Sequence, residues 1–398
     1  MRKYSDKIIF LFSIIFLLFN YGCENLTTPS INEDKFKGLT TDPIINSVSP
    51  LEGFSGVTIF TIKGSNFSVE KNNNVIYFNG IKGEVQSATS TEIKVKAANV
   101  VKDTVLVKLS VYGAEKFSNS SMIKLIAPLT LFGEFLATDE PWGMTSDKDG
   151  NIYVSLMNSG VGVGIKKVLP SGSKSDYATT PGITKFSNLK LADDGIIYGA
   201  RTVKAIYTIP AGGGTSSIWV SFGLLGTVFD LDVDANGNVW AGGNNTFVNS
   251  IKPDKTIKQF PLEGNIRSLK INNNYLYVAG TFQTEEIIYR AKIISADSIL
   301  AWEEYFNLTK SSIGGSNVFI YGIGFLQNGD LFIGTDGFNP IKIIKADKSV
   351  FELFPGVITP TFHIFTKAPI GFIYGLLGTS KDGIVVSSKK IYKIVTTN

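Results

Sequence analysis

The chain has 398 residues, of which 43% are hydrophobic and 18% are charged, and it carries a formal net charge of +4 at pH 7. This globular composition excludes disorder on a large scale, and the small net charge without Lys/Arg clusters excludes a nucleic-acid partner. Forty glycines and 28 phenylalanines, without blocks of helical periodicity, favour strands and tight turns. We therefore expect an all-β protein.

Residues 1–22 have the pattern of an export signal. Basic residues precede the apolar run 8–19, which is too short to span a bilayer because a spanning helix needs about 20 residues. The run ends just before Cys23, the only cysteine in the chain. The segment resembles a bacterial lipoprotein signal peptide, which implies that Cys23 is lipidated and becomes the new N-terminus. An ordinary secretory signal with an incidental cysteine is the alternative.

The next segment, residues 23–42, is polar and is predicted to be a flexible tether between the lipid and the folded part. A lipidated Cys23 leaves no thiol for an internal disulfide, so packing must stabilise the fold. The resemblance implies an outer-membrane lipoprotein of the bacterial cell envelope. It leaves open whether the protein faces the periplasm or the outer surface.

Residues 43–126 are predicted to form a β-sandwich. Residues 57–62 alternate between two faces as a sandwich strand does, and Asn79-Gly80 favours a type I′ hairpin turn. The order of a proline, a glycine-rich turn, a strand, Gly64-x-x-Phe67 and a later strand ending in Asn79-Gly80 resembles the IPT/TIG family. The resemblance implies an immunoglobulin-like domain that acts as a spacer or interaction module, without a catalytic role.

Residues 128–398 contain six copies of one pattern: an apolar strand, a tight polar turn and a second apolar strand. The first copy spans 142–154, the third spans 228–240, and the others turn at Asp194-Gly195, Asn273-Asn274, Asn328-Gly329 and Ile370-Gly371. A period of about 40 to 55 residues with such turns predicts a β-propeller of six blades. The region resembles NHL-type propellers. Leu129–Leu136 is expected to supply the fourth strand of the final blade and to close the ring.

The residues that enter each innermost strand should converge on the propeller axis. Counting back from each turn selects Trp142, Asn188, Asp230, Arg267, Tyr321 and His363. Aromatic rings mixed with polar groups suit a polar ligand with faces that stack, such as a sugar. The structural alternative is that Asp230 pairs with Arg267 while the aromatic side chains plug the channel.

Few residues are available for catalysis or metal binding. His363 is the only histidine, so a histidine-rich zinc site cannot form and a Ser-His-Asp triad would have to use this residue. Residues 232–237 imitate a calcium loop, but the twelfth position is Gly243, and turn chemistry explains the pattern. We predict no catalytic residue, no metal and no cofactor, although paired carboxylates among Asp230, Glu140 and Glu263 leave glycosidase chemistry open.

These expectations combine into one functional hypothesis. The protein is predicted to be a lipid-anchored envelope protein whose propeller recognises a polysaccharide or an envelope protein, with the IPT/TIG-like domain as a spacer. The alternative is a propeller hydrolase or lactonase that acts at the central mouth.

Overall fold

The computed structural model describes residues 41–202, 205–222, 226–315, 317–326, 328–356, 361–367, 372–381 and 384–395. These residues form strands joined by turns, with a 3-10 turn at Lys71–Asn73, so the all-β prediction is confirmed. No helix in these ranges is long and apolar enough to cross a membrane. The predicted lipidation site, Cys23, lies outside the described residues. The chain divides into two compact units, one ending at Leu125 and one that combines Phe54–Thr58 with Ile126 onward.

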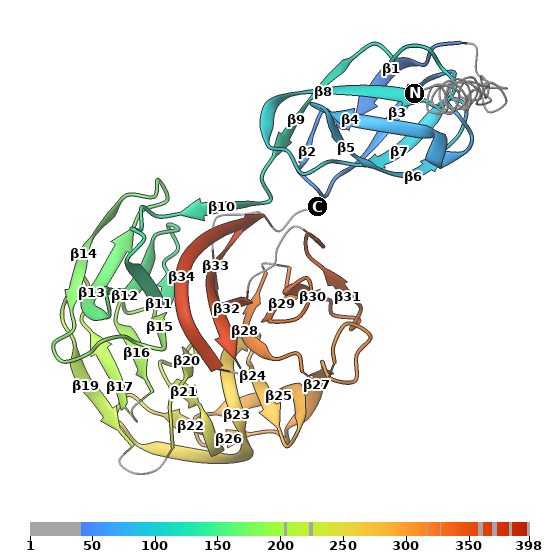
Figure 1. Cartoon of the computed structure of the whole chain (residues 1–398). Helices are drawn as coiled ribbons and strands as arrows, with labels where there is room; N and C mark the ends of the chain where they lie inside the picture. The colour runs from blue at the N-terminus through green and yellow to red at the C-terminus, as the bar shows by residue number, and fades with distance from the viewer. Residues whose placement is uncertain are drawn as a thin grey trace, which may run out of the picture. The chain divides into compact units, whose positions relative to one another are not determined.

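The first unit is a sandwich of two sheets (Figure 1). The first sheet has the order β1 (Ile44–Ser49), β3 (Ile59–Ser65), β7 (Glu92–Lys96) and β6 (Glu84–Ala88). The second sheet has the order β2 (Glu52–Phe54), β9 (Ser121–Ile126), β8 (Lys102–Val111), β4 (Asn74–Phe78) and β5 (Ile81–Lys82).

The sandwich core follows the alternation of its strands. On β3, Phe60 and Ile62 are fully buried, whereas Ile59 is exposed, so the even-numbered residues face the core. The turn after β4 has positive φ angles at both Asn79 (49°) and Gly80 (86°), as a type I′ turn requires. The predicted hairpin is therefore confirmed.

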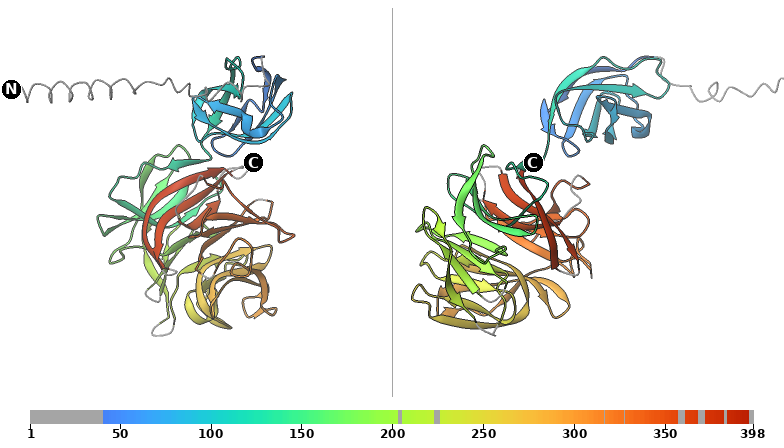
Figure 2. Two further views of the ribbon diagram at one scale, coloured as in Figure 1. Left: turned by 45° about the vertical axis from the view of Figure 1, so that its right-hand side comes forward. Right: turned by 60° about the vertical axis from the view of Figure 1, so that its left-hand side comes forward.

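In the described residues, the second unit is a ring of six blades with four main strands each (Figures 1 and 2). The short strands β18 (Gly214–Thr215) and β26 (Ser298–Ile299) add to the first and fourth blades. The first two blades are β11 (Asp139–Ser146), β12 (Ile152–Asn158), β13 (Val161–Val168) and β14 (Lys174–Thr179), then β15 (Asn188–Leu191), β16 (Ile197–Arg201), β17 (Ala205–Ile209) and β19 (Ser217–Ser221). The next two are β20 (Asp230–Val233), β21 (Val239–Gly242), β22 (Asn244–Ile251) and β23 (Ile257–Asn272), then the end of β23 with β24 (Tyr275–Phe282), β25 (Glu285–Ser295) and β27 (Glu303–Asn307). The last two are β28 (Ile320–Phe325), β29 (Leu331–Thr335), β30 (Ile341–Ile344) and β31 (Val350–Glu352), then β32 (Thr361–Lys367), β33 (Phe372–Lys381), β34 (Ile384–Val395) and β10 (Leu129–Phe132).

The ring closes as the repeat pattern predicts. β10 pairs antiparallel with β34, from Leu129 opposite Ile394 to Phe132 opposite Ile391, and so supplies the fourth strand of the final blade. The strand stops at Phe132 rather than at the predicted Leu136. Gly133 follows with a φ of +79°, a left-handed conformation that an extended strand cannot contain.

The blade turns are stabilised by one aspartate each in the first and third blades. Asp147 accepts backbone N–H groups of Asp149 and Asn151, and its other carboxylate oxygen accepts the Asn151 amide. Asp234 does the same in the third blade and also accepts the indole N–H of Trp240 at 3.0 Å. Turn chemistry thus accounts for the sequence that imitates a calcium loop.

Polar side chains also accept hydrogen bonds from backbone N–H groups at the free edges of the innermost strands. The Leu191 N–H donates to Thr145 of the preceding blade at 3.0 Å, and the Ile271 N–H donates to Asp232 at 2.8 Å. The Ile323 N–H donates to the Ser268 hydroxyl at 3.1 Å. Each contact occupies a donor that would otherwise be unpaired at a strand edge, and it fixes the register between blades.

Candidate functional site

Four of the six predicted axial residues lie on innermost strands and are buried. The exposed fraction is 7% for Trp142, 4% for Asn188, 1% for Asp230 and 2% for Tyr321. A side chain this buried has little surface left for a ligand.

Asn188 and Asp230 form the centre of a hydrogen-bond network. The Asn188 amide donates to one Asp230 oxygen, which also accepts the Leu231 N–H. The other oxygen accepts the Ser268 hydroxyl, the Leu269 N–H at 2.7 Å and the Lys270 ammonium at 2.9 Å. The carboxylate thus receives five donors from three consecutive blades, and its charge is paired and fully hydrogen-bonded.

Arg267 does not pair with Asp230, so that part of the structural alternative is wrong. Its guanidinium pairs with Glu286 on β25 of its own blade, and it also donates to the Thr281 hydroxyl at 2.8 Å and the Ile320 carbonyl at 2.6 Å. No pattern in the sequence indicated this pairing, because Glu286 lies on the third strand of the blade and the positions counted back from the turns lie only on first strands.

Trp142 is covered by a lysine. The Lys185 ammonium lies 3.0 Å from the centroid of the Trp142 ring. Burial lowers the pKa of Lys185 to about 8, and the nearby Glu140 carboxylate only partly offsets this effect. The indole face that a sugar would need is therefore occupied by a cation.

Of the two remaining predicted residues, the structure describes the side chain of Tyr321 but not that of His363. The Tyr321 hydroxyl donates to Asp336 at 3.0 Å, and its ring lies 5.7 Å from the Arg267 guanidinium carbon. His363 lies on β32, and its side chain falls outside the described part of the chain. The structure thus brings Asn188 close to Asp230 and Arg267 close to Tyr321, but it does not gather the predicted residues into an open mouth.

A cavity of about 350 Å³ lies where the same innermost strands end. All six innermost strands contribute to it. Its polar lining consists of Thr145, Ser146, Asp147, Lys148, Lys190, Asp193, Asp232, Lys270, Asn272 and Thr366, and its apolar lining includes Met144, Leu189, Leu191, Ile271, Phe325 and Phe365. We call this cavity the central pocket.

Two lysines and an aspartate organise the charges of the central pocket. The Lys190 ammonium lies 2.5 Å from Asp232, whose side chain is 3% exposed. Burial pushes the pKa of Asp232 up, but the charges of Lys190 and Lys270 outweigh it and hold this pKa below the ordinary value. Burial likewise opposes the charge of Lys190, and Asp232 raises its pKa above the usual range. Both groups therefore stay charged at neutral pH.

Strand alternation links the central pocket to the predicted positions. Lys190, Asp232 and Lys270 each stand two residues beyond Asn188, Asp230 and Ser268, so each pair shares a face of its strand. This period-two relationship is readable from the sequence. It does not tell which end of the channel is closed by side chains.

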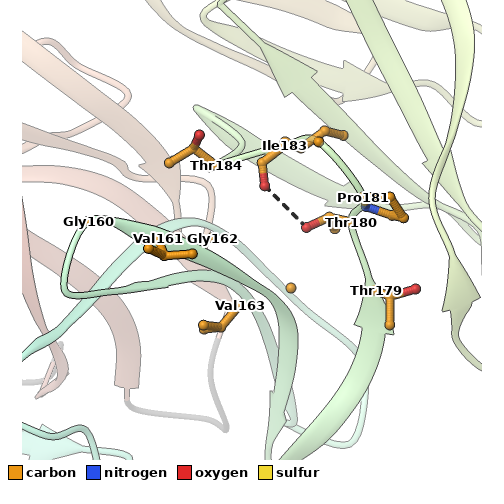
Figure 3. A pocket seen from close by; sticks show the side chains of 11 residues that line it. Gly160, Val161, Gly162, Val163, Thr179, Thr180, Pro181, Ile183 and Thr184 are labelled. Atoms are coloured by element: carbon orange, nitrogen blue, oxygen red, sulfur yellow. Dashed lines mark hydrogen bonds between the residues drawn. The ribbon is translucent and has the colours of Figure 1, made fainter.

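A second hollow lies at the edge of the first blade. It has a volume of about 570 Å³ and is lined by residues 160–164 and 179–184, which face each other across it (Figure 3). Glycine is required at position 162 because a Cβ on Gly162 would lie 2.4 Å from the Ile183 carbonyl oxygen. The Thr180 hydroxyl donates to this carbonyl at 3.5 Å. Its lining has hydroxyl and methyl groups but no charged side chain, so it offers fewer polar contacts than the central pocket.

Metal ligands do not cluster in the described ranges, where no group of three or more His, Cys, Asp and Glu side chains could hold an ion. Asp230 and Asp232, the buried acids nearest the axis, already accept hydrogen bonds from lysines and backbone N–H groups. The arrangement offers both donors and acceptors to a ligand in the central pocket.

Comparison with known proteins supports the division of the chain. Residues 43–124 match the family model of the IPT/TIG domain. An auxiliary nutrient binding protein from Bacteroides thetaiotaomicron superimposes with a TM-score of 0.51 at 11% identity, covering 90% of this chain and 98% of that one. A gluconolactonase from Xanthomonas campestris gives a TM-score of 0.50 at 12% identity, covering 67% of this chain and 88% of that one. No curated protein matches the sequence.

At these identities, the structural matches show the fold alone. The family match and the six described blades agree with the architecture that the sequence motifs indicate. Residues 43–124 thus match the IPT/TIG domain, and the described residues from Ile126 onward form a β-propeller of six blades.

Proposed function

We propose that this protein is a non-catalytic, lipid-anchored protein of the bacterial cell envelope and that its propeller binds a saccharide in the central pocket. The observation that carries this proposal is the composition of the pocket. Charged, amide and hydroxyl groups from five of the innermost strands surround one cavity together with the ring of Phe325 from the sixth. A sugar needs this combination, because it presents hydroxyl groups around its rim and C–H groups on its faces.

The lysine side chains of the pocket are held in position before a ligand binds. Lys190 and Lys270 are held by Asp232 and Asp230, so their positions cost little additional entropy on binding. Lys190 is 35% exposed and Lys270 is 19% exposed in their side chains, which leaves ammonium groups available as donors. The buried residues at the other end of the channel would then support the ring rather than contact the ligand.

The rest of the chain fits an envelope location. Lipidation at Cys23 would attach the protein to the membrane, and residues 24–42 with the IPT/TIG domain would act as the tether and spacer. The similarity to an auxiliary nutrient binding protein agrees with a binding role. An envelope protein as the partner is the alternative, and it would require a contact surface outside the central pocket.

A glycan array tests this proposal. The chain from Asn25 onward should bind a restricted set of saccharides, and Lys190→Gln should weaken that binding about tenfold because it removes a charged donor. Lys252→Gln is the matched control, since Lys252 also pairs with an aspartate, Asp297, but does not line the pocket. Equal loss in both variants, or no saccharide bound by the parent, would refute the proposal.

A further inference from the structure

Next to the central pocket, the fourth and fifth blades form a cluster of tyrosines and cations. Phe325, which lines the pocket, lies 4.8 Å from the Tyr277 ring, and Tyr277 lies 5.1 Å from the Tyr305 ring. Asn272, also in the pocket lining, pairs with Tyr275 across the β23–β24 hairpin. The cluster is thus continuous with the pocket through two separate contacts.

Two cationic side chains, Arg290 and Lys348, lie against the tyrosine rings of this cluster. The Arg290 guanidinium carbon lies 4.7 Å from the centroid of Tyr275 and 5.0 Å from that of Tyr305. The Lys348 ammonium, from the turn between β30 and β31, lies 2.8 Å from the Tyr305 centroid. Glu303 pairs with Arg290 at 2.5 Å and offsets one of the two charges.

The surroundings of Lys348 disfavour its charged form, and a bound anion would reduce this penalty. Partial desolvation at the ring, together with the like charge of Arg290, lowers the pKa of Lys348 to about 8, although Glu303 opposes this shift. Lys348 is nevertheless exposed and can reach a ligand, and the Arg290 side chain is 28% exposed. A carboxylate between the two cations would be bound by charge-assisted hydrogen bonds.

We propose that Arg290, Lys348 and Tyr305 form a subsite for the carboxylate of a uronic acid residue, next to the central pocket. The inference rests on the proposed saccharide-binding function and names its ligand class, an acidic polysaccharide. The central pocket holds one sugar unit, and the cluster selects chains that carry a carboxylate on a nearby unit.

The test compares hexagalacturonate with its fully methyl-esterified form, which differs only in the carboxylates. Isothermal titration calorimetry on the full chain in detergent should show the acid bound at least about fivefold more tightly than the ester. Lys348→Gln should bring this ratio close to one. Lys345→Gln is the control, because Lys345 belongs to the same turn but contacts Phe351 instead of Tyr305, and it should leave the ratio unchanged.

Any other outcome refutes the proposed carboxylate subsite. It fails if neither form binds, if acid and ester bind equally, or if the two variants change the ratio alike. Failure of the subsite is separable from failure of the binding function. A neutral saccharide that binds on the array, depends on Lys190 and is indifferent to Lys348 would support the central pocket and remove only the acidic subsite.

Discussion

Asn188 at the start of β15 donates a hydrogen bond to Asp230 at the start of β20, and so connects the second blade to the third. Asp230 extends the connection to the fourth blade through Ser268, Leu269 and Lys270. One buried carboxylate therefore joins three blades on the propeller axis. Its position matches that of a ligand-binding residue in the sequence pattern, but all its hydrogen bonds serve the ring.

Replacing this carboxylate should destabilise the propeller. Asp230→Ala leaves the Lys270 ammonium, the Asn188 amide and three other donors without their acceptor, which should lower the free energy of unfolding by about 3 kcal/mol. Denaturant unfolding measures the change. Asp254→Ala is the control, because Asp254 is exposed and accepts its hydrogen bond within a surface turn, and it should change the free energy of unfolding far less than Asp230→Ala. Similar losses in the two variants would contradict a central role for Asp230.

Trp142 should also matter for stability and not for affinity. Because the side chain is 7% exposed, Trp142→Ala should create a cavity and cost about 3 kcal/mol or more of unfolding free energy. The affinity for a saccharide selected on the array should stay within about twofold of the parent, since Trp142 does not line the central pocket. A stable variant that had lost binding would instead place the ligand at the opposite end of the channel.

The architecture was predictable because local chemistry repeats in each blade. Asp147 and Asp234 stand at equivalent turn positions in the two copies 142–154 and 228–240. The predicted turn at Ile370-Gly371 lies outside the described residues. Repetition identifies the element and its register, so the number of blades follows directly.

The site was harder to predict because it depends on contacts between strands far apart in sequence. Counting back from the turns selected Asn188 and Asp230, which the structure places at the starts of β15 and β20. The repeat pattern could not show that Arg267 forms an ion pair with Glu286, or that the Lys185 ammonium lies over the Trp142 ring. Which end of the channel stays open is decided by such tertiary contacts, not by the periodicity of any one strand.

Closure of the ring should depend on β10. A chain that starts at Ala127 keeps this strand, whereas one that starts at Gly133 loses it and exposes the edge of β34. The shorter chain also loses Phe132, which packs with Ile391 and Leu376 in the core between the final and first blades. We expect a clearly lower melting temperature or aggregation for the shorter chain. Identical melting temperatures in differential scanning calorimetry would show that β10 is dispensable.

The Lys190–Asp232 pair should stabilise the propeller in a defined pH window. The pKa of Asp232 lies below its ordinary 3.8, so this contribution is present above that value and is lost as the pH falls through the lowered pKa. The pKa of Lys190 lies above its ordinary 10.5, so the contribution is present below that value and is lost as the pH rises through the raised pKa. The difference in unfolding free energy between the parent and Lys190→Gln should therefore be constant at neutral pH and shrink at both extremes. A difference that does not vary with pH would attribute the effect to packing.

The location of the bound saccharide tests the central claim most directly. A crystal structure of the protein with an array-selected saccharide should show a sugar ring in the central pocket, hydrogen-bonded to Lys190 or Asn272 and packed against Phe325. A saccharide found beside Trp142, in the hollow of the first blade or on the IPT/TIG domain, with the central pocket empty, would contradict the account.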